Sequence, residues 1–258
     1  MVVPQIKQEE LHIWWANLRD FDSDLPSLQS VLSPWEQARA ERFRFLRDRD
    51  NYIICHGILR MLLGSYVGQS PSDLSLTIGA YGKPELRAGS GGGGIHFNLS
   101  HSRDLVLCGI TGACPIGVDV EYLQPIPRCE RIAREFFSQT EAESLRALPR
   151  EFRTQHFFDL WTRKEALLKA TGDGLGHGQT IRHAFLSEPQ ASDLTDESMP
   201  MRISAEWRVR SFSPTPGYIA AVAFRNPNLD LSCRTVPAFF SEVYCGSRRR
   251  VPRNPEAV

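Results

Sequence analysis

The segment Leu167-Leu168-Lys169-Ala170-Thr171-Gly172 resembles Leu59-Arg60-Met61-Leu62-Leu63-Gly64, which lies earlier in the same chain. In both segments apolar residues recur at helical spacing until a glycine, which predicts a helix that ends there. The two helices are expected over Tyr52–Leu63 and Thr154–Thr171. A pair of strands follows each helix at a similar distance. The pattern therefore predicts an α+β fold with two similar α+β halves in one chain. The alternative is that such echoes arise in any chain of mixed helices and strands.

Stretches with apolar residues at every second position predict the strands of each half. A strand is also expected at the start of the chain, over Leu11–Leu18. Ser33, Pro34 and Glu36 form a capping-box pattern, which predicts the start of a helix. The expected strands that follow the helices are Leu74–Ile78, Ile95–Leu99, Leu105–Thr111, Trp207–Phe212 and Tyr218–Phe224.

The boundary between the halves is expected in the loop-like joint between Gly112 and Ile116. It divides the chain into an N-terminal half at residues 1–114 and a C-terminal half at residues 115–227. The second half would contain the metal site described below. Residues 228–258 form a C-terminal extension, and Arg248-Arg249-Arg250 with the prolines that follow predicts a flexible tail.

The composition is that of a globular protein and excludes several classes. The chain has 258 residues, of which 41% are hydrophobic and 23% charged, so disorder, collagen and coiled coil are excluded as the dominant state. Thirty Lys plus Arg balance thirty Asp plus Glu. No global field favours nucleic acid or an anionic membrane, so any anion site must be local.

Cysteine usage and the absence of long apolar stretches predict a cytoplasmic location. The six cysteines have no C-x-x-C spacing and are too dilute for a disulfide framework. Met1–Glu10 lacks the apolar region of a signal peptide. Leu105–Val118 is the longest uncharged stretch, and it falls short of the roughly 20 apolar residues of a membrane-spanning helix. No membrane anchor is expected.

Asp119 and Glu121 lie in the expected strand Gly117-Val118-Asp119-Val120-Glu121 and share one face of it, because side chains alternate along a strand. Two adjacent like charges are costly unless they share a cation, and carboxylate oxygens suit Mg²⁺. The alternative is a strand end with two solvated carboxylates. The strand alone does not decide between these interpretations.

Glu165 and Lys169 lie one helical turn apart in Trp161–Lys169. Glu165 would supply a third carboxylate to the site. The alternative is an ordinary surface ion pair, which is worth only about 0.2–0.5 kcal/mol.

Three further segments offer groups that bind anions. Ser100, His101 and Ser102 are expected in a turn whose small donors hold a phosphate, because neighbouring Ser and His residues rarely form a nucleophile and base. Lys83 is displayed in the turn Tyr81-Gly82-Lys83-Pro84. The arginines of Arg39–Arg49 form either an anion-binding face or a solvated helix face. The tetraglycine Gly91–Gly94 precedes a strand and is interpreted as a linker.

The order of these motifs resembles that of the large 4′-phosphopantetheinyl transferases, the type that activates surfactin synthetase. The resemblance extends from about Ser33 to Phe224. The family folds as two similar α+β halves, which agrees with the internal echo. The motifs that carry the resemblance are Tyr81–Pro84, Phe97–Ser102, Gly117–Glu121, Phe136–Glu141, Trp161–Lys169 and Gly172–Leu175.

The resemblance implies a monomeric enzyme with coenzyme A as co-substrate. The enzyme would transfer the 4′-phosphopantetheine moiety to a serine of an apo carrier protein, either an acyl, a polyketide or a peptidyl carrier, and release 3′,5′-ADP. No nucleic acid or membrane partner is implied. Two alternatives remain: a Mg²⁺-dependent phosphodiester or pyrophosphate hydrolase that uses Asp119 and Glu121, and a non-catalytic carrier-protein binder.

The resemblance also implies the roles of the metal-binding and catalytic residues. Asp119, Glu121 and Glu165 would bind Mg²⁺, or Mn²⁺, together with the pyrophosphate of coenzyme A. Glu165, directly or through a bound water, would be the general base for the carrier serine. Lys169 would hold a phosphate oxygen. Whether Glu141 shares the role of Glu165 stays open.

By the same resemblance, Ser100 and His101 would contact the phosphates of coenzyme A, and Lys83 would lie against its adenosine end. The chain departs from the family where an arginine and a lysine are usual, because Asn51 and Glu36 occupy those positions. We therefore expect the 3′-phosphate to be held by one or more of three arginines of the neighbouring segment, namely Arg39, Arg47 and Arg49.

Overall fold

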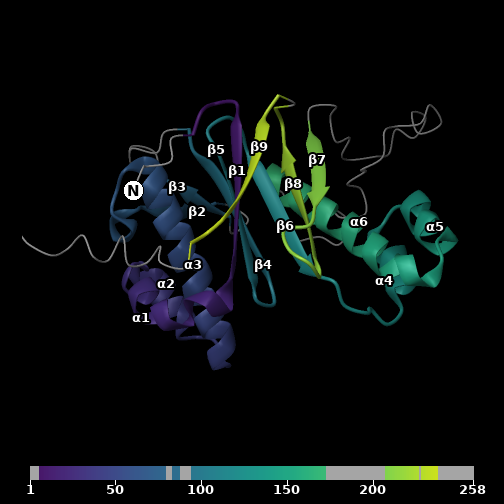
Figure 1. Cartoon of the computed structure of the whole chain (residues 1–258), viewed down its shortest axis with the longest axis horizontal. Helices are drawn as coiled ribbons and strands as arrows, with labels where there is room; N and C mark the ends of the chain where they lie inside the picture. Colours follow the sequence, from purple (N-terminus) through teal and green to yellow (C-terminus); the bar gives the residue numbers. More distant parts are fainter. Residues whose placement is uncertain (1–5, 80–82, 88–93, 173–206, 227, 238–258) are drawn as a thin grey trace, which may run out of the picture.

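The computed structural model describes residues 6–79, 83–87, 94–172, 207–226 and 228–237 (Figure 1). The first half contains β1 (Glu10–Asn17), the 3-10 turn η1 (Leu18–Asp24), α1 (Leu25–Ser30), α2 (Pro34–Ala40), α3 (Leu46–Val67), η2 (Pro71–Asp73), β2 (Leu76–Ile78), β3 (Pro84–Leu86), β4 (His96–Ser102) and β5 (Leu105–Thr111). The second half contains β6 (Ile116–Tyr122), α4 (Cys129–Phe136), α5 (Gln139–Ala147), α6 (Arg150–Thr171), β7 (Arg208–Phe212) and β8 (Tyr218–Phe224), and β9 (Asp230–Thr235) follows.

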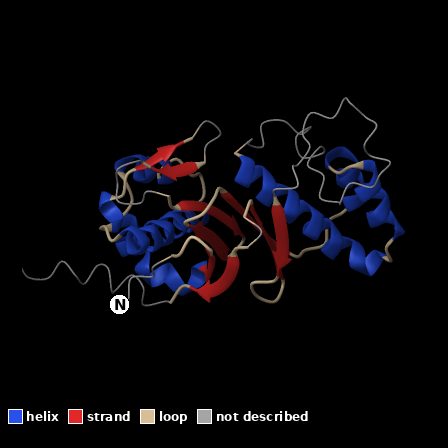
Figure 2. Cartoon of the chain, turned by 90° about the horizontal axis from the view of Figure 1, so that it is seen from above, coloured by secondary structure: helices blue, strands red, loops and turns tan. Residues whose placement is uncertain are grey.

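The two halves use the same strand arrangement, which confirms the predicted α+β fold of two similar halves. In the first sheet β5 lies between β4 and β1, and both pairs are antiparallel. In the second sheet β8 lies between β7 and β6, again with antiparallel pairs. Figure 2 shows the two sheets next to each other at the centre, with helices at both ends.

Strand β9 belongs to the sheet of the first half. It pairs in parallel with β1, so part of the segment expected as a C-terminal extension completes the first sheet. The predicted flexible tail, from residue 238 onward, lies outside the described residues. The same holds for Tyr81 and Gly82 of the predicted turn and for Gly91–Gly93 of the predicted linker.

Each half has one long helix of 22 residues, α3 and α6, which ends at a glycine with left-handed backbone. The predicted end of α6 at Gly172 is confirmed. The predicted end of the first helix at Gly64 is wrong, because α3 continues to Val67 and ends at Gly68 (φ 68°). Gly64 serves packing instead: an added Cβ would lie 2.8 Å from the carbonyl oxygen of Gln69.

A capping box begins the short helix before each long helix. Glu36 caps α2 with Ser33, as the sequence predicts, and Glu141 caps α5 with Ser138. Each glutamate also binds a fully buried cation of the long helix in its half. The pairs are Glu36 Oε2 with Arg60 Nε at 2.6 Å and Glu141 Oε2 with Lys164 Nζ at 2.9 Å. Removing one partner of such a pair typically costs about 3–5 kcal/mol.

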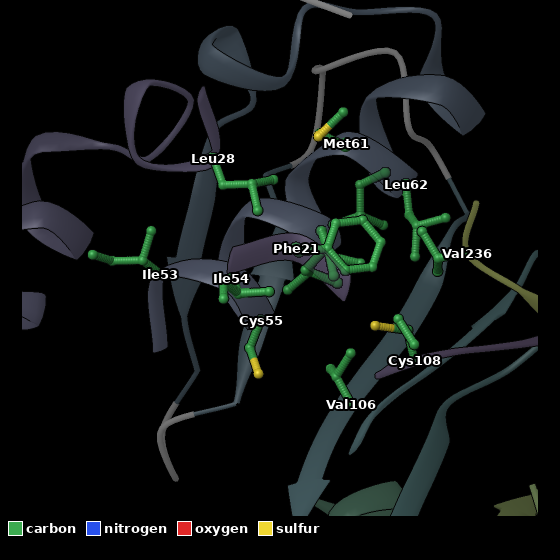
Figure 3. Close-up of a cluster of buried hydrophobic side chains, with 14 of the residues drawn as sticks. Phe21, Leu28, Ile53, Ile54, Cys55, Met61, Leu62, Val106, Cys108 and Val236 are labelled. Atoms are coloured by element: carbon green, nitrogen blue, oxygen red, sulfur yellow. The ribbon is translucent and has the colours of Figure 1, made fainter. Parts of the chain in front are cut away.

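The hydrophobic core has separate layers. In the first half, side chains of α3 such as Ile54 and Leu62 belong to one core cluster with Phe21 of η1 and Val106 of β5 (Figure 3). A second cluster lies between the two sheets and joins the halves; its members include Leu11, Ile13, Leu107, Val118 and Val222. Each fully buried side chain of this size contributes about 1.5–3 kcal/mol. The inter-sheet layer therefore holds the two halves in one arrangement.

Strand β4 is longer than predicted, and this changes the setting of the candidate site. The sequence predicts a strand over Ile95–Leu99 followed by a turn, whereas β4 continues to Ser102. Only Arg103 and Asp104 form the turn to β5. Ser100, His101 and Ser102 therefore alternate across a strand instead of gathering in a turn.

No helix within the described ranges is long and apolar enough to cross a membrane.

Gly117 sets how closely β6 approaches α6, and its replacement should be costly. An added Cβ would lie 1.9 Å from Ala166 O and 2.4 Å from Ala170 N. We expect Gly117→Ala to lower the free energy of unfolding by at least about 2 kcal/mol, because the two backbones must separate. Urea unfolding measures this value.

Gly112→Ala is the matched control for Gly117→Ala. The nearest atom to a Cβ there is Ile6 Cγ2 at 3.7 Å, an ordinary contact. Its effect should stay within about 0.5 kcal/mol. Equal losses in the two variants would mean that the close approach at Gly117 does not constrain the fold.

Candidate functional site

The candidate site lies along the seam where β4 of the first sheet runs beside β6 of the second. Three alternate residues of β4 bridge the seam with their side chains. The hydrogen bonds run from Val118 N to Asn98 Oδ1 (2.9 Å), from Ser100 Oγ to Asp119 Oδ1 (2.9 Å) and from Ser102 Oγ to Glu121 Oε2 (2.8 Å). Because the residue numbers of these pairs rise together on β4 and β6, the two strands run in the same direction.

Asp119 is the centre of the polar contacts at the seam. Its side chain is buried, and Oδ1 accepts hydrogen bonds from Ser100 and from Lys169 Nζ, the latter at 2.7 Å. Lys169 Nζ also donates to Ser100 Oγ at 3.0 Å. The structure thus brings together Asp119 of β6, Lys169 of α6 and Ser100 of β4, three residues from distant segments.

Glu165 reaches the same region from α6, one turn before Lys169. It is 4% exposed, and its Oε1 has no hydrogen-bond partner among the described residues. Burial, followed by the negative charges of Asp119 and then Glu121, raises the pKa of Glu165 to about 7; Lys169 opposes this shift. A carboxylate with such a pKa can take up and release a proton near neutral pH.

The three acidic residues do not form a finished metal site. Within the described ranges, no group of three His, Cys, Asp or Glu side chains is arranged to hold a metal ion. Even so, Asp119 Oδ2 and Glu165 Oε1 are buried oxygens that have no hydrogen-bond partner in the described part of the chain. Burial and then the charge of Asp119 raise the pKa of Glu121, although Ser102 donates to it. Crowded carboxylates with free oxygens fit a hard divalent cation such as Mg²⁺.

His101 points to the other face of β4, because neighbouring residues of a strand face opposite sides. There it borders a pocket of about 380 Å³ between β4, α2 and α3. Partial desolvation of the ring by neighbouring groups, followed by the positive charges of Lys169 and His56, lowers the pKa of His101. Trp35 and Tyr52 offer aromatic rings at the same pocket.

Of the three predicted arginines, only Arg39 borders this pocket. Its guanidinium carbon lies 5.6 Å from the ring centre of Trp35 and 6.0 Å from that of Tyr52. Arg47 pairs with Asp104. Arg49 pairs with its neighbour Asp50. Which of the three arginines holds the 3′-phosphate stays a prediction, and Arg39 is the one whose position at the pocket favours it.

Lys83 lies elsewhere, between the two halves. Its Nζ donates to the backbone carbonyls of Ile116 and Lys169, each at 2.8 Å. Burial lowers the pKa of Lys83, and Glu85 partly opposes this shift. The residue also borders a second pocket of about 420 Å³ beside the end of α6.

Glu141, whose role the sequence left open, has a structural position. One oxygen accepts from Ser138 N and binds Lys164, so the carboxylate caps α5 and ties it to α6. Sequence reasoning missed the bridging roles of Asn98 and Ser102. Their spacing at every second residue around Ser100 was the available signal, and it was hidden by the expectation of a turn.

The raised pKa of Glu165 predicts how stability depends on pH. The folded chain holds the Glu165 proton up to about pH 7, whereas an unperturbed glutamate has a pKa of 4.5. Folding therefore binds a proton in this window, and the free energy of unfolding should fall as pH rises from 4.5 to 7. The expected loss is on the order of 3 kcal/mol in metal-free buffer.

Urea unfolding of the wild type and Glu165→Gln at pH 5 and pH 8 measures this contribution. The glutamine variant should lack this component of the decrease and should be the more stable protein at pH 8. Glu143→Gln, at an exposed position of α5, is the control and should keep the wild-type dependence. An identical pH dependence in wild type and Glu165→Gln would contradict the raised pKa.

Two family models match the two halves. Residues 15–111 match the model described as "4′-phosphopantetheinyl transferase, N-terminal", and residues 115–223 match that of the 4′-phosphopantetheinyl transferase superfamily. The two matches adjoin at the loop where the sequence places the boundary between the halves.

Several curated relatives carry the same family name. The 4′-phosphopantetheinyl transferase HetI of Nostoc sp. is 38% identical over 83% of this chain and 87% of its own length. The enzyme psf-1 of Bacillus pumilus is 33% identical over 79% of this chain and 83% of its own length. The enzyme Sfp of Bacillus subtilis is 29% identical over 77% and 84%. With matches that span both halves, the chain belongs to the 4′-phosphopantetheinyl transferase superfamily.

Proposed function

We propose that the seam between β4, β6 and α6 is the active site, and that it transfers 4′-phosphopantetheine from coenzyme A to a carrier-protein serine with the help of Mg²⁺. Membership of the superfamily carries the transferase activity. The observation that supports this site is the meeting of Asp119, Glu165 and Lys169 with Ser100, from three elements of both halves.

The carboxylates would hold the divalent cation together with the pyrophosphate of coenzyme A. Asp119 Oδ2 and Glu165 Oε1 would supply buried oxygens, which have no other partner among the residues that the structure describes. Glu121, held by Ser102, supplies the third carboxylate. A bound cation supplies charge neutralisation on the pyrophosphate. Mg²⁺ fits oxygen ligands of this kind, and Mn²⁺ is the expected substitute.

Glu165 is proposed as the general base. The serine oxygen of the carrier forms a new bond to the phosphorus that bears the pantetheine arm, the bond to the bridging oxygen breaks, and 3′,5′-ADP leaves. The serine proton passes to Glu165, directly or through one water. In the metal-free chain the pKa of Glu165 is about 7, and a cation bound beside it would lower this pKa and keep the carboxylate ionised, as a base must be.

Lys169 and Ser100 would bind phosphate oxygens beside the carboxylates. Lys169 is placed for this role because its ammonium group already bridges Ser100 and Asp119. When coenzyme A binds, the Lys169 ammonium group could exchange its hydrogen bond to the Asp119 carboxylate for one to a nearby phosphate oxygen. Charge-assisted hydrogen bonds of this kind are about twice as strong as neutral ones.

The pocket beyond His101 would take the adenosine end of coenzyme A. Arg39 offers fixed positive charge for the 3′-phosphate, and the rings of Trp35 and Tyr52 offer apolar faces for a purine. His101 lines this pocket on the face of β4 opposite Ser100, and we propose that it binds a phosphate of coenzyme A from there.

The proposal includes a single-chain enzyme acting in the cytoplasm on an apo acyl, polyketide or peptidyl carrier. Both halves that build the site come from one chain, which supports a monomer. Five cysteines of the described part of the chain are free thiols, which suits a reducing compartment.

Substitution of the carboxylates tests the metal and base roles. Asp119→Asn and Glu165→Gln should each lower transfer at least about 1,000-fold, because they remove charge from the reacting centre. Chelation of divalent metal should stop transfer and added Mg²⁺ should restore it. Mass spectrometry of a carrier protein and release of 3′,5′-ADP measure the reaction, with Glu143→Gln as control.

The same assay separates the alternatives. Cleavage of coenzyme A without a protein acceptor would favour a hydrolase. Tight binding of a carrier with no modification of any carrier tested, whether fatty-acid, polyketide or peptidyl, would favour a non-catalytic binder.

Binding of the 3′-phosphate is tested with Arg39→Ala. This variant should raise KM about tenfold for coenzyme A and leave KM for 3′-dephospho-coenzyme A unchanged, because it removes one charged hydrogen bond. His101→Ala should raise KM for both substrates. Arg42→Ala, an exposed arginine outside the pocket, is the control. A rise in KM with Arg47→Ala and none with Arg39→Ala would overturn the assignment.

A further inference from the structure

We propose that Lys83 is a positioning residue that fastens the start of β6 to the end of α6, and so sets the spacing of the carboxylates that those two elements carry. The inference deepens the proposed function and rests on it, since Asp119 and Glu165 are the groups that are positioned. It gives Lys83 a different task from contact with the adenosine of coenzyme A.

The geometry of the ammonium group carries the proposal. Lys83 Nζ donates to Ile116 O and to Lys169 O, both at 2.8 Å. Ile116 is the first residue of β6, and Lys169 lies in the last turn of α6. The lysine itself comes from the first half, just before β3. One side chain thus joins three segments from both halves.

The chemistry of both acceptors suits a cation. The last four carbonyl groups of a helix lack partners within the helix, and Lys169 O is one of them in α6. The negative end of the helix dipole adds attraction for positive charge. The Lys83 ammonium group therefore satisfies a carbonyl that the helix itself leaves unpaired.

The fastening acts where the two elements touch. At Gly117, the residue after Ile116, an added Cβ would lie 1.9 Å from Ala166 O, so the backbones of β6 and α6 are in direct contact. Glu165 directly precedes Ala166. Asp119 follows Gly117 by two residues and accepts from the side chain of Lys169, whose carbonyl Lys83 binds. A small shift at this crossing moves both carboxylates.

Contact with coenzyme A would use Lys83 in another way. Two of its three N–H donors are directed at backbone carbonyls. Its pocket of about 420 Å³ adjoins the pocket at His101 and Arg39 at Pro84, but Lys83 itself lines only the first of the two. Loss of a substrate contact weakens binding, whereas loss of a positioning contact mainly slows the chemical step. A substrate contact at Lys83 therefore predicts that its removal raises KM and leaves kcat largely unchanged. A positioning contact predicts that its removal lowers kcat and leaves KM largely unchanged.

The test compares Lys83→Met with the wild type and with Lys83→Arg, which keeps charge and several donors. Transfer kinetics give kcat and KM for coenzyme A, and calorimetry gives Kd for 3′,5′-ADP. Lys83→Met should lower kcat at least about tenfold and leave KM and Kd within about twofold, because small misplacement of reacting groups is costly. Lys83→Arg should recover most of kcat. Arg87→Met, at an exposed residue of the same pocket, should match the wild type.

Hydrogen exchange adds a readout independent of turnover. Amides at the end of α6, around Ala170 and Thr171, should exchange faster in Lys83→Met and not in Arg87→Met. If the wild type transfers nothing, the proposed function fails while this exchange comparison still tests the fastening. Unchanged exchange would overturn the inference by itself.

Other outcomes also decide the matter. Weaker binding of 3′,5′-ADP with unchanged kcat would make Lys83 a substrate contact and overturn the inference. Unchanged kinetics would overturn it as well. If Lys83→Met does not fold, Lys83→Gln removes the charge and keeps a donor for one carbonyl. The same loss of kcat with unchanged Kd is required of it, and any other pattern overturns the inference.

Discussion

The direct contact between the backbones of β6 and α6 at Gly117 is the constraint on which the candidate site depends. No side chain separates the two elements there, since an added Cβ would lie within 1.9 Å of Ala166 O. Asp119 and Glu165 lie one or two residues from this crossing, so their separation follows from it. Because a packed interior has few voids, a change at the crossing is transmitted to the carboxylates without being absorbed.

The seam between β4 and β6 brings residues of β4 to the carboxylates of the site. The two strands belong to different sheets and are joined by side chains of Asn98, Ser100 and Ser102. Strand alternation then divides the work of β4 between its faces. Ser100 faces the carboxylates, and His101 faces the pocket beside α2 and α3. One strand thus connects the place of the proposed reaction with the place of proposed adenosine binding.

The two halves share a buried ion pair between a capping glutamate and the long helix, and they differ in the residue that follows the cation in that helix. In each half a capping-box glutamate holds a buried cation of the long helix, Arg60 in α3 and Lys164 in α6. The next residue is the buried Met61 in the first half and Glu165 in the second. The same helix position therefore serves the apolar core in one half and places a carboxylate of raised pKa in the other.

Local patterns in the sequence were enough to predict the strand that carries Asp119 and Glu121, the helical turn between Glu165 and Lys169, and the two similar halves. These features depend on periodicity and capping, which neighbouring residues determine. The prediction that the first long helix ends at Gly64 is wrong. This glycine leaves room for the backbone of Gln69, and in the sequence such a glycine cannot be told from one that ends a helix. Other features follow from tertiary packing alone. Ser100 meets Asp119, and Lys83 binds backbone carbonyls. Arg39 borders the pocket, whereas Arg47 and Arg49 pair with aspartates. Such contacts join residues far apart in the chain, so their partners are selected by how the sheets and helices pack and not by spacing along the sequence.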